Sequence, residues 1–438
     1  MSAADATPVT TTDAPAQSAR LAAQVLALSA IAVVVGLLGG AGATAFVGVE
    51  HHLQAWLWED LPESLGQTST AAWLVVVLLL TGGLITYLAE RLPGEGGHTP
   101  LHGFGLDIGP REVVSVVIAA LGSLSFGAVV GPEAPLMAVG TAMGGLAFRD
   151  PTKPVRQVML LVGAMAAIGA IFGNPLITCV LLLEFAIVGG PRLATPLVLM
   201  PALAGLASGY LIQVGFEGWS GLGEAKLSLP GLEPYPEVQF ADVWVSVPLA
   251  VLTGVAAMAA RLGGLQVVRL AQRHRLATML GGAAIVALCA IAVRAQTGGS
   301  LELVLFSGQT AMTEYLALTS AATALVVLVG KFIAYSVSLG NGFRGGAIFP
   351  AIAMGVVLSA AAAVLVDATT TSALAATAIA AATAAAMRLP FTALLLGVVL
   401  TYPAGGATTV LAIIGTIVGL ATRLAGERLA PALAPDAH

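Results

Sequence analysis

The sequence contains 438 residues, of which 58% are hydrophobic and 9% are charged, and its formal net charge at pH 7 is −5. An ordinary soluble domain carries about 25% charged residues, so this composition excludes a soluble globular protein and predicts an integral membrane protein. The basic segments lack the interleaved aromatic residues that are typical of nucleic-acid contacts. We therefore expect the lipid bilayer, and no nucleic acid, as a partner.

The chain begins with a polar segment, residues 1–19, that is rich in Ala, Thr and Asp. This segment lacks the basic region of a cleaved signal peptide, and we predict that it is a disordered cytoplasmic tail. Apolar runs near the ~20 residues that a spanning helix needs follow it and predict about ten to twelve crossings. These runs cover residues 21–49, 72–89, 112–130, 157–186, 194–214, 243–260, 277–293, 315–338, 346–366, 371–386 and 391–422.

The placement of charged residues predicts the orientation of the chain. One basic cluster contains Arg149, Lys153 and Arg156, and a second lies between residues 261 and 275. The positive-inside rule places both in the cytoplasm, together with the N-terminus, and we expect a multi-pass protein of the inner (plasma) membrane. The predicted parts are a first transmembrane half (20–214), an external loop (215–242), a second transmembrane half (243–433) and a tail (434–438).

A repeat with an offset of 215 residues relates the two halves. Residues 131–135 and 346–350 share the pattern Gly-x-x-x-Pro, and each segment leads into an apolar helix. The same offset relates Pro175 to Pro390, which both begin an apolar stretch. Chance matches among 52 Gly and 23 Pro are the alternative explanation, but inverted repeats of broken helices are typical of transporters.

The two Gly-x-x-x-Pro segments predict loop-to-helix starts, because proline fits the first helical turn and glycine lets the backbone approach a ligand. Helix N-termini carry unsatisfied N–H groups and a positive partial charge. Two such N-termini that face one cavity near mid-membrane would bind an anion such as chloride without a buried Lys or Arg. We also predict that the helices that begin at Pro175 and Pro390 run in opposite senses.

At these segments the chain resembles the CLC family of chloride channels and transporters, and it is most similar to a divergent bacterial branch of ion-transport proteins. Residues 131–135 resemble the signature Gly-Arg/Lys-Glu-Gly-Pro, and residues 346–350 resemble Gly-x-Phe-x-Pro with the aromatic residue one position late. Residues 96–100 are similar to Gly-Ser-Gly-Ile-Pro, and Ala430 stands at the position of the family's inner tyrosine. The resemblance implies an all-α membrane fold, with an inverted repeat of broken and re-entrant helices, that works as a homodimer.

The resemblance also implies the residues of the site. Glu133 falls on the family's gating glutamate, whose carboxylate competes with the permeant anion for the helix N-termini. A helix-start carboxylate that only complements the dipole is the alternative. The anion-binding positions that the resemblance carries over are Gly131, Ala134, Gly346, Ala347 and Ile348, with Gly97 and His98 from the weaker signature.

Other ionisable residues in apolar runs are candidates for function, because charge at membrane depth is costly. Glu184 lies one residue before the family's internal proton acceptor, a position that Phe185 occupies. It predicts either a proton relay or a structural ion pair with Arg192. Three cations of the second half predict either snorkelling to an interface or a vestibule that attracts anions; Arg344 is the preferred vestibule residue, beside Lys331 and Arg388.

No cofactor, metal or enzymatic activity is predicted. Cys179 and Cys289 lie inside apolar runs, and the pair His98 and His102 has no nearby Cys that would complete a zinc site. No His-Glu-x-x-His or paired-Asp motif lies within a span. The leading prediction is transport of chloride or a similar small anion, by passive conduction or by proton-coupled exchange. A cation-coupled organic-solute carrier is a weaker alternative, since Glu133 is the only well-placed carboxylate.

Overall fold

The computed structural model is helical throughout most of the chain, as predicted. It describes residues 13–103, 105–106, 108–148, 150, 153–188, 190, 193–220, 227–366 and 370–430. The helices of the first half are α1 (Asp13–Ala55), η1 (Trp56–Asp60), α2 (Leu61–Ser64), α3 (Ala72–Ala89), α4 (Val113–Leu124), α5 (Glu133–Ala147), α6 (Pro154–Phe172), α7 (Pro175–Val188), α8 (Pro196–Gly215) and α9 (Glu217–Ser220). Those of the second half are α10 (Phe240–Ala271), α11 (Arg275–Thr297), η2 (Leu301–Leu303), α12 (Met312–Leu316), α13 (Ala321–Gly340), α14 (Ile348–Leu365), α15 (Thr371–Met387), α16 (Pro390–Leu400), η3 (Tyr402–Ala404) and α17 (Thr408–Leu429).

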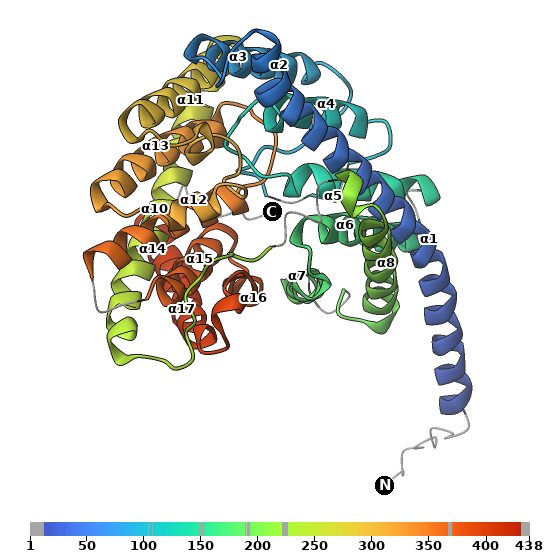
Figure 1. Ribbon diagram of the computed structural model, residues 1–438. Coiled ribbons are helices and arrows are strands. Elements are labelled where there is room, and N and C mark those ends of the chain that lie inside the picture. Colours follow the sequence, from blue (N-terminus) through green and yellow to red (C-terminus); the bar gives the residue numbers. More distant parts are fainter. Residues whose placement is uncertain are drawn as a thin grey trace.

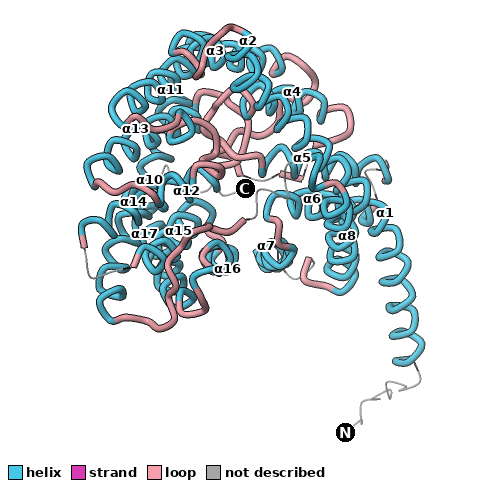
Figure 2. The backbone as a smooth tube through the Cα atoms, viewed as in Figure 1, coloured by secondary structure: helices cyan, strands magenta, loops and turns pink. Residues whose placement is uncertain are grey.

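The helices surround a centre of irregular segments. In Figure 1 the first half forms the blue and green side of an open ring, the second half forms the yellow and red side, and α7 and α16 face each other. Loops from both halves gather in the middle of this ring (Figure 2). Backbone without regular hydrogen bonds is tolerated at membrane depth only where protein buries it or where it lines a cavity. The centre of the ring is therefore the place to look for a transport site.

The predicted repeat is visible in the helix boundaries. Adding 215 to the first residues of α5 and α7 gives Ile348 and Pro390, which are the first residues of α14 and α16. The same offset carries the last residue of α6 to Met387, the last residue of α15. Three boundaries that keep one offset exclude a chance match of glycine and proline patterns.

The helices α7 and α16 run in opposite senses, as predicted. The carboxylate of Glu184, near the end of α7, accepts hydrogen bonds from the first turn of α16. The opposite ends of the two helices both lie against one short segment, because Gly173 lies beside Leu227 and the N–H of Leu229 donates to the carbonyl of Leu400 at 2.8 Å. This antiparallel pairing fits an inverted repeat.

Several predicted runs are broken in the structure. The run 157–186 divides into α6 and α7 at Gly173, whose φ of 56° ends α6. The run 391–422 divides into α16 and α17, because the segment around η3 contains a proline and a glycine with φ of 115°. Nine described segments are long and apolar enough to cross a membrane, and α4, α7, α15 and α16 are shorter. Hydrophobicity found these segments but did not locate the breaks.

The boundaries of the predicted parts differ from those of the observed helices. Helix α1 begins at Asp13, so the prediction of a disordered segment through residue 19 is wrong for residues 13–19. This stretch is rich in Ala, a strong helix former, and begins with an acidic residue, which favours a helix N-terminus. The predicted external loop contains α9 and ends where α10 begins at Phe240. Residues 1–12 and 434–438 lie outside the described residues.

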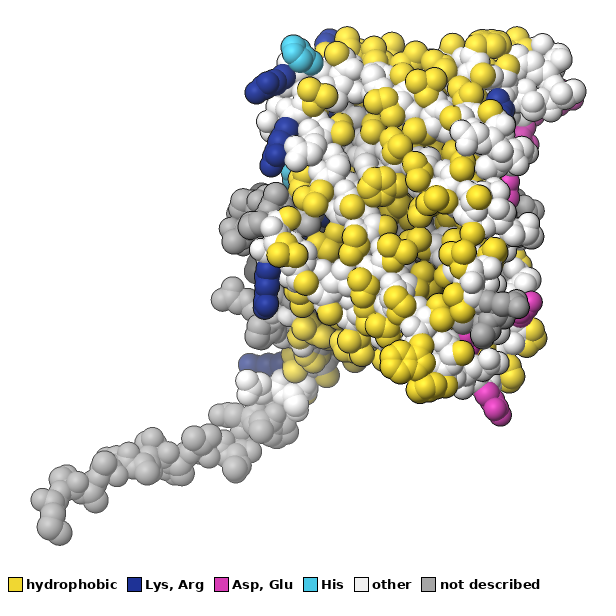
Figure 3. All heavy atoms as spheres, turned by 90° about the vertical axis from the view of Figure 1, so that its left-hand side faces the viewer, with side chains coloured by type: hydrophobic (Ala, Val, Ile, Leu, Met, Phe, Trp, Pro, Cys, Tyr) yellow, Lys and Arg dark blue, Asp and Glu magenta, His cyan; other side chains and the backbone are white. Residues whose placement is uncertain are grey.

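Charge is segregated on the surface. In Figure 3 hydrophobic side chains cover the middle of the face, most of the visible Lys and Arg lie along one edge, and the visible Asp and Glu lie along the opposite edge. A band of apolar surface between two charged edges is the arrangement that a bilayer requires. The basic edge corresponds to the side that we predict to be cytoplasmic.

Candidate anion-binding site

The two Gly-x-x-x-Pro turns meet at the centre of the molecule, as predicted. The N–H of Gly131 donates to the carbonyl of Gly346 at 2.8 Å, and the N–H of Gly346 donates back to the carbonyl of Gly131 at 2.5 Å. This isolated antiparallel bridge joins residues that the 215-residue offset makes equivalent. Two equivalent residues that exchange hydrogen bonds mark the local two-fold relation between the halves.

The carboxylate of Glu133 lies in this junction. Its Oε1 atom accepts a hydrogen bond from the N–H of Phe349 at 3.1 Å, and its Oε2 atom has no partner among the described residues. The side chain is fully buried. A Cβ atom at Gly131 or at Gly346 would overlap the carboxylate in its present position, so glycine at both turns makes room for this side chain. Glu133 therefore begins α5 of one half and lies at the N-terminus of α14 of the other half.

The two helices that meet at Glu133 are not capped by the residues that precede them. Pro132 precedes α5 and Ala347 precedes α14, and neither residue caps its helix with a side-chain hydrogen bond. The first-turn N–H groups, including those of Ala134 and Ile348, have no partner within their own helices, and the Glu133 carboxylate interacts with that of Ile348. An anion at this junction would find backbone donors and helix dipoles, while Glu133 supplies a carboxylate of the protein itself.

The third predicted segment contributes a loop beside this junction. Gly96 and Gly97 both adopt positive φ, and the N–H of Gly96 donates to the hydroxyl of Ser115 at 3.3 Å. A small cavity lies between this loop and the start of α5. Its lining includes Gly96, His98, Ala134, Pro135, Arg344 and Gly345. The structure thus brings His98 and Ala134 to one cavity, whereas Gly97 is not among its lining residues.

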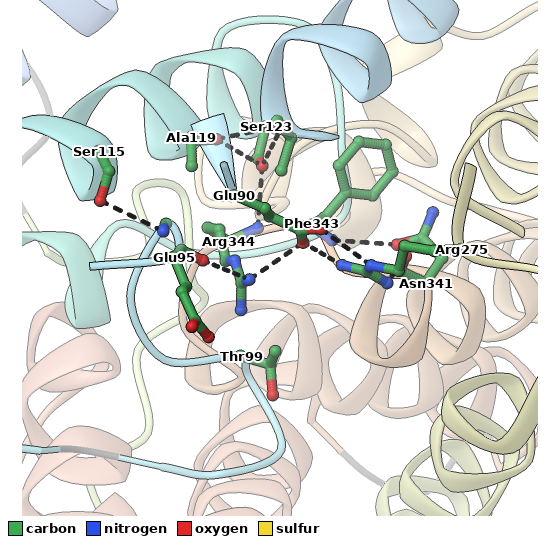
Figure 4. A network of polar contacts seen from close by, with 12 residues as sticks. Glu90, Glu95, Thr99, Ser115, Ala119, Ser123, Arg275, Asn341, Phe343 and Arg344 are labelled. Atoms are coloured by element: carbon green, nitrogen blue, oxygen red, sulfur yellow. Dashed lines mark hydrogen bonds and ion pairs between the residues drawn. The ribbon is translucent and has the colours of Figure 1, made fainter. Parts of the chain in front are cut away.

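Arg344 lies in a network of charges next to this cavity (Figure 4). Its Nη2 atom donates to the carboxylate of Glu90 at 3.0 Å and to the carbonyl of Glu95 at 2.8 Å. Arg275 binds the same carboxylate and donates to the carbonyl of Asn341 at 2.7 Å. One carboxylate thus serves two guanidinium groups, and the side chain of Glu95 adds a second negative charge near Arg344. The Nε atom of Arg344 has no partner among the described residues.

The sequence pattern missed Glu90 and the role of Arg275. Glu90 follows α3, and Arg275 had been assigned to a solvent-facing basic cluster. Glu90 and Arg275 bind each other although they lie 185 residues apart along the chain. A local sequence pattern cannot predict such a pair. The only available signal was an isolated carboxylate at the end of an apolar run, which membrane proteins seldom leave unpaired.

Glu184 has a different environment. Its carboxylate accepts hydrogen bonds from the N–H groups of Phe391 and Thr392, each at 2.7 Å, and from the hydroxyl of Thr392. Both carboxylate oxygens are therefore satisfied by the first turn of α16. The predicted partner Arg192 lies outside the described residues.

Two other predicted cations do not reach the cavity. Arg388 forms an ion pair with Glu427 at 2.8 Å. Lys331 neither snorkels to an interface nor lines the cavity, so both predictions for it are wrong. Its side chain is fully buried and donates hydrogen bonds to backbone carbonyls of residues 304–306. These carbonyls follow the short helix η2 (Leu301–Leu303), and no pattern in the sequence indicates that Lys331 would reach them.

The sequence and the fold are similar to those of known membrane transport proteins. A family model described as "Voltage gated chloride channel" matches residues 98–423. Curated relatives with the name "Putative ion-transport protein YfeO" include one from Escherichia coli O139:H28, which is 26% identical over 351 residues and aligns 76% of this chain with 78% of its own. A relative with the same name from Shigella flexneri is 26% identical over 354 residues.

Solved structures share the fold over most of the chain. The crystal structure of a slow cyanobacterial Cl⁻/H⁺ antiporter matches with a TM-score of 0.75 and 21% identity, covering 92% of this chain and 95% of that one. A CLC-type fluoride/proton antiporter matches with a TM-score of 0.67 and 19% identity, covering 91% and 96%. The structure of a eukaryotic CLC transporter matches with a TM-score of 0.69 and 16% identity, covering 91% and 72%.

Proposed function

The chain belongs to the voltage-gated chloride channel family, and we propose that it carries chloride or a similar small inorganic anion across the membrane along a path gated by Glu133. The transported anion occupies the junction of the two Gly-x-x-x-Pro turns. Backbone N–H groups of α5 and α14 bind it, with the contacts expected at Gly131, Ala134, Gly346, Ala347 and Ile348. His98 lines the approach beside Arg344, and a contact with the anion is also expected at Gly97 of the same loop.

One observation carries this proposal. The carboxylate of Glu133 lies at the N-terminus of α14 with one oxygen hydrogen-bonded and the other without a partner. Among the described residues, no Lys or Arg forms an ion pair with it. Backbone dipoles alone stabilise its charge, and they would stabilise a chloride ion by the same means. Protonation removes the charge of the side chain, so that the anion can replace it.

The environment of Glu184 supports passive or weakly proton-coupled transport. A proton relay needs a carboxylate that can release its partners, whereas Glu184 is bound through both oxygens to α16. We expect anions to move with little or no stoichiometric uphill proton transport. Proton-coupled exchange is the alternative, because two of the similar structures are described as antiporters with protons.

We further propose the setting in which this transport occurs. The segregation of basic and acidic side chains in Figure 3 supports an orientation with the basic edge and the N-terminus in the cytoplasm. The inner (plasma) membrane is the expected location. We expect two copies to associate, as the resemblance implies, each with its own path. Cross-linking of the purified protein in lipid nanodiscs tests this, and a product with the mass of a single chain would contradict it.

Ion flux from proteoliposomes tests the function directly. Vesicles that hold the purified protein and a chloride gradient should release chloride faster than protein-free vesicles, as measured with a chloride electrode. A pH-sensitive dye in the same vesicles reports proton movement. Release at the protein-free rate, for chloride, nitrate and fluoride alike, would contradict anion transport. Uphill proton movement in fixed ratio to chloride would establish the exchanger.

A further inference from the structure

Lys331 is a buried cation that the proposed transport path does not use. It is the eleventh of the 20 residues of α13, and none of its surface is exposed. A charged side chain at the middle of an apolar helix is a candidate for function by default. Burial of an ammonium group is very unfavourable unless acceptors satisfy all of its N–H groups.

Three backbone carbonyls satisfy this ammonium group. Its Nζ atom donates to the carbonyl oxygens of Val304, Leu305 and Phe306 at 3.0, 3.1 and 3.1 Å. An ammonium group has three donors, and this cage provides three acceptors. Among the described residues, no carboxylate forms an ion pair with Lys331. Rings of backbone carbonyls are also the ligands by which proteins bind monovalent cations.

The carbonyl groups of residues 304–306 also depend on this contact, because the ammonium group is a hydrogen-bond donor to all three. Residues 304–306 follow the short helix η2 and end at Phe306, whose φ is 58°. Their carbonyls lie at the depth of the middle of α13, where backbone groups must find partners within the protein. Without the ammonium group, three successive carbonyls would lose this partner.

The caged loop supports the segment that leads to Glu133. The ring of Phe306 packs edge-on against Trp58, with 5.4 Å between ring centroids, and its N–H donates to the carbonyl of Gly127 at 3.4 Å. The indole N–H of Trp58 donates to the carbonyl of Ser125 at 2.9 Å. The position of residues 304–306 therefore determines where residues 125–131 lie.

One face of α13 makes all of these attachments. Lys331, Tyr335 and Ser338 follow the spacing i, i+4, i+7 and share a face. The hydroxyl of Tyr335 donates to the carbonyl of Ala347 at 2.7 Å, and the N–H of Val129 donates to the hydroxyl of Ser338 at 3.2 Å. This face holds residues 304–306, the segment before Glu133 and the start of α14 in one frame.

We propose that residues 304–306 form a monovalent-cation site whose resident cation is the ammonium group of Lys331, and that this tethered cation positions the segment in front of Glu133. The second part rests on the proposed function, and the first part does not. An emptied cage should accept a free ammonium or alkali cation of similar size. Larger cations such as choline should not fit between three adjacent carbonyls.

Chemical rescue tests the site. Lys331→Ala should lower the melting temperature of the detergent-solubilised protein, and ammonium or methylammonium should restore most of this loss, whereas choline with the same anion should not. The matched control is Lys153→Ala, since Lys153 is 65% exposed and binds only Asp150 on its own loop. Equal responses to ammonium and choline, or an equal response of the control, would overturn the site. Rescue of stability needs no transport, so it is independent of the proposed function.

A measurement on the unaltered protein covers the case in which Lys331→Ala does not fold. The sequence has only three lysines, so ¹⁵N labelling of lysine should give one ammonium signal with slow hydrogen exchange. Fast exchange at every lysine would overturn the cage. For the positioning role, Lys331→Met should reduce chloride flux several-fold while retaining its pH profile, because Glu133 itself is unchanged. Flux equal to wild type would contradict that role.

Discussion

Glu133 and Glu184 are two buried carboxylates of the first half, and each lies against the N-terminus of a helix from the second half. Glu184 is bound through both oxygens, by two backbone N–H groups and the hydroxyl of Thr392. Glu133 is bound through one oxygen, and glycines face the other. The same helix-terminus electrostatics stabilises both charges. Under the proposed function, this difference in donors makes Glu184 a fixed link between the halves and Glu133 an exchangeable group.

The comparison also explains why similar sequence signals have different meanings. Both glutamates lie in apolar surroundings near a proline that begins a helix, and both had been candidates for proton or anion chemistry. A hydroxyl-bearing residue after Pro390 adds a third donor for Glu184. At the other junction Gly131 and Gly346 leave the space that the Glu133 carboxylate fills. Small residues therefore surround the carboxylate that we propose to be the gate, and an extra donor binds the one that we propose to be structural.

The largest expected effect follows substitution of the exchangeable carboxylate. Glu133→Gln should raise chloride flux at pH 7 by about tenfold to a hundredfold, which corresponds to ~1.4–2.7 kcal/mol of lost competition. The amide imitates the protonated acid and leaves the backbone donors intact, so flux should also lose most of its acid dependence. Chloride efflux between about pH 4.5 and 7.5, a range that extends upward from the ordinary carboxyl pKa, measures both effects. Unchanged flux and an unchanged pH profile would make Glu133 a structural residue.

Substitution of the fixed carboxylate should act on stability instead. Glu184→Gln replaces a charged acceptor at a helix N-terminus by a neutral one and should lower the free energy of unfolding by about 1–2 kcal/mol. Flux per folded molecule should change little. Thermal unfolding and efflux of the same preparation separate the two quantities. Loss of proton-coupled transport at wild-type stability would instead show that Glu184 relays protons, and the contrast with Glu133 would then fail.

Arg344 tests whether the approach to the Glu133 junction is electrostatic. Arg344→Met should reduce flux by about fivefold at low ionic strength, because a unit charge contributes ~1 kcal/mol to the energy of an anion about 17 Å away at an effective dielectric constant of ~20. The deficit should shrink in 1 M salt, where the Debye length is about 3 Å. Efflux at two ionic strengths measures this dependence. Arg388→Met is the control, since its side chain pairs with Glu427 away from the cavity. An equal, salt-independent loss in both variants would refute a vestibule role.

The smallest expected effect concerns the hydroxyl of Thr392, which is the third donor to Glu184. Thr392→Val removes only the hydroxyl that binds Glu184 and should cost ~0.6 kcal/mol, a typical value for a hydrogen bond between transmembrane helices. Thr392→Ser keeps the hydroxyl and should preserve stability. Comparison of the two melting temperatures gives the contribution of that donor. Equal losses in both variants would show that the methyl group, rather than the hydroxyl, matters here.

The sequence by itself determined the membrane setting, the repeat and the identity of the central carboxylate. These properties follow from composition and from residues with strong local preferences. Glycine and proline restrict the backbone conformation at residues 131–135 and 346–350. The constant offset of 215 residues between the halves can be read directly from the sequence. Glu133 could be singled out because a charge inside an apolar run is costly and therefore informative.

Only the tertiary structure decided which groups satisfy each charge. The partners of Glu184 and Arg344 lie more than 200 residues away along the chain, and the carbonyls that hold Lys331 belong to a loop with no recognisable sequence pattern. Helix breaks at Gly173 and near η3 likewise depend on what packs around them. Local sequence specifies backbone preference and polarity, whereas the role of a buried ion is set by the donors and acceptors that folding brings to it.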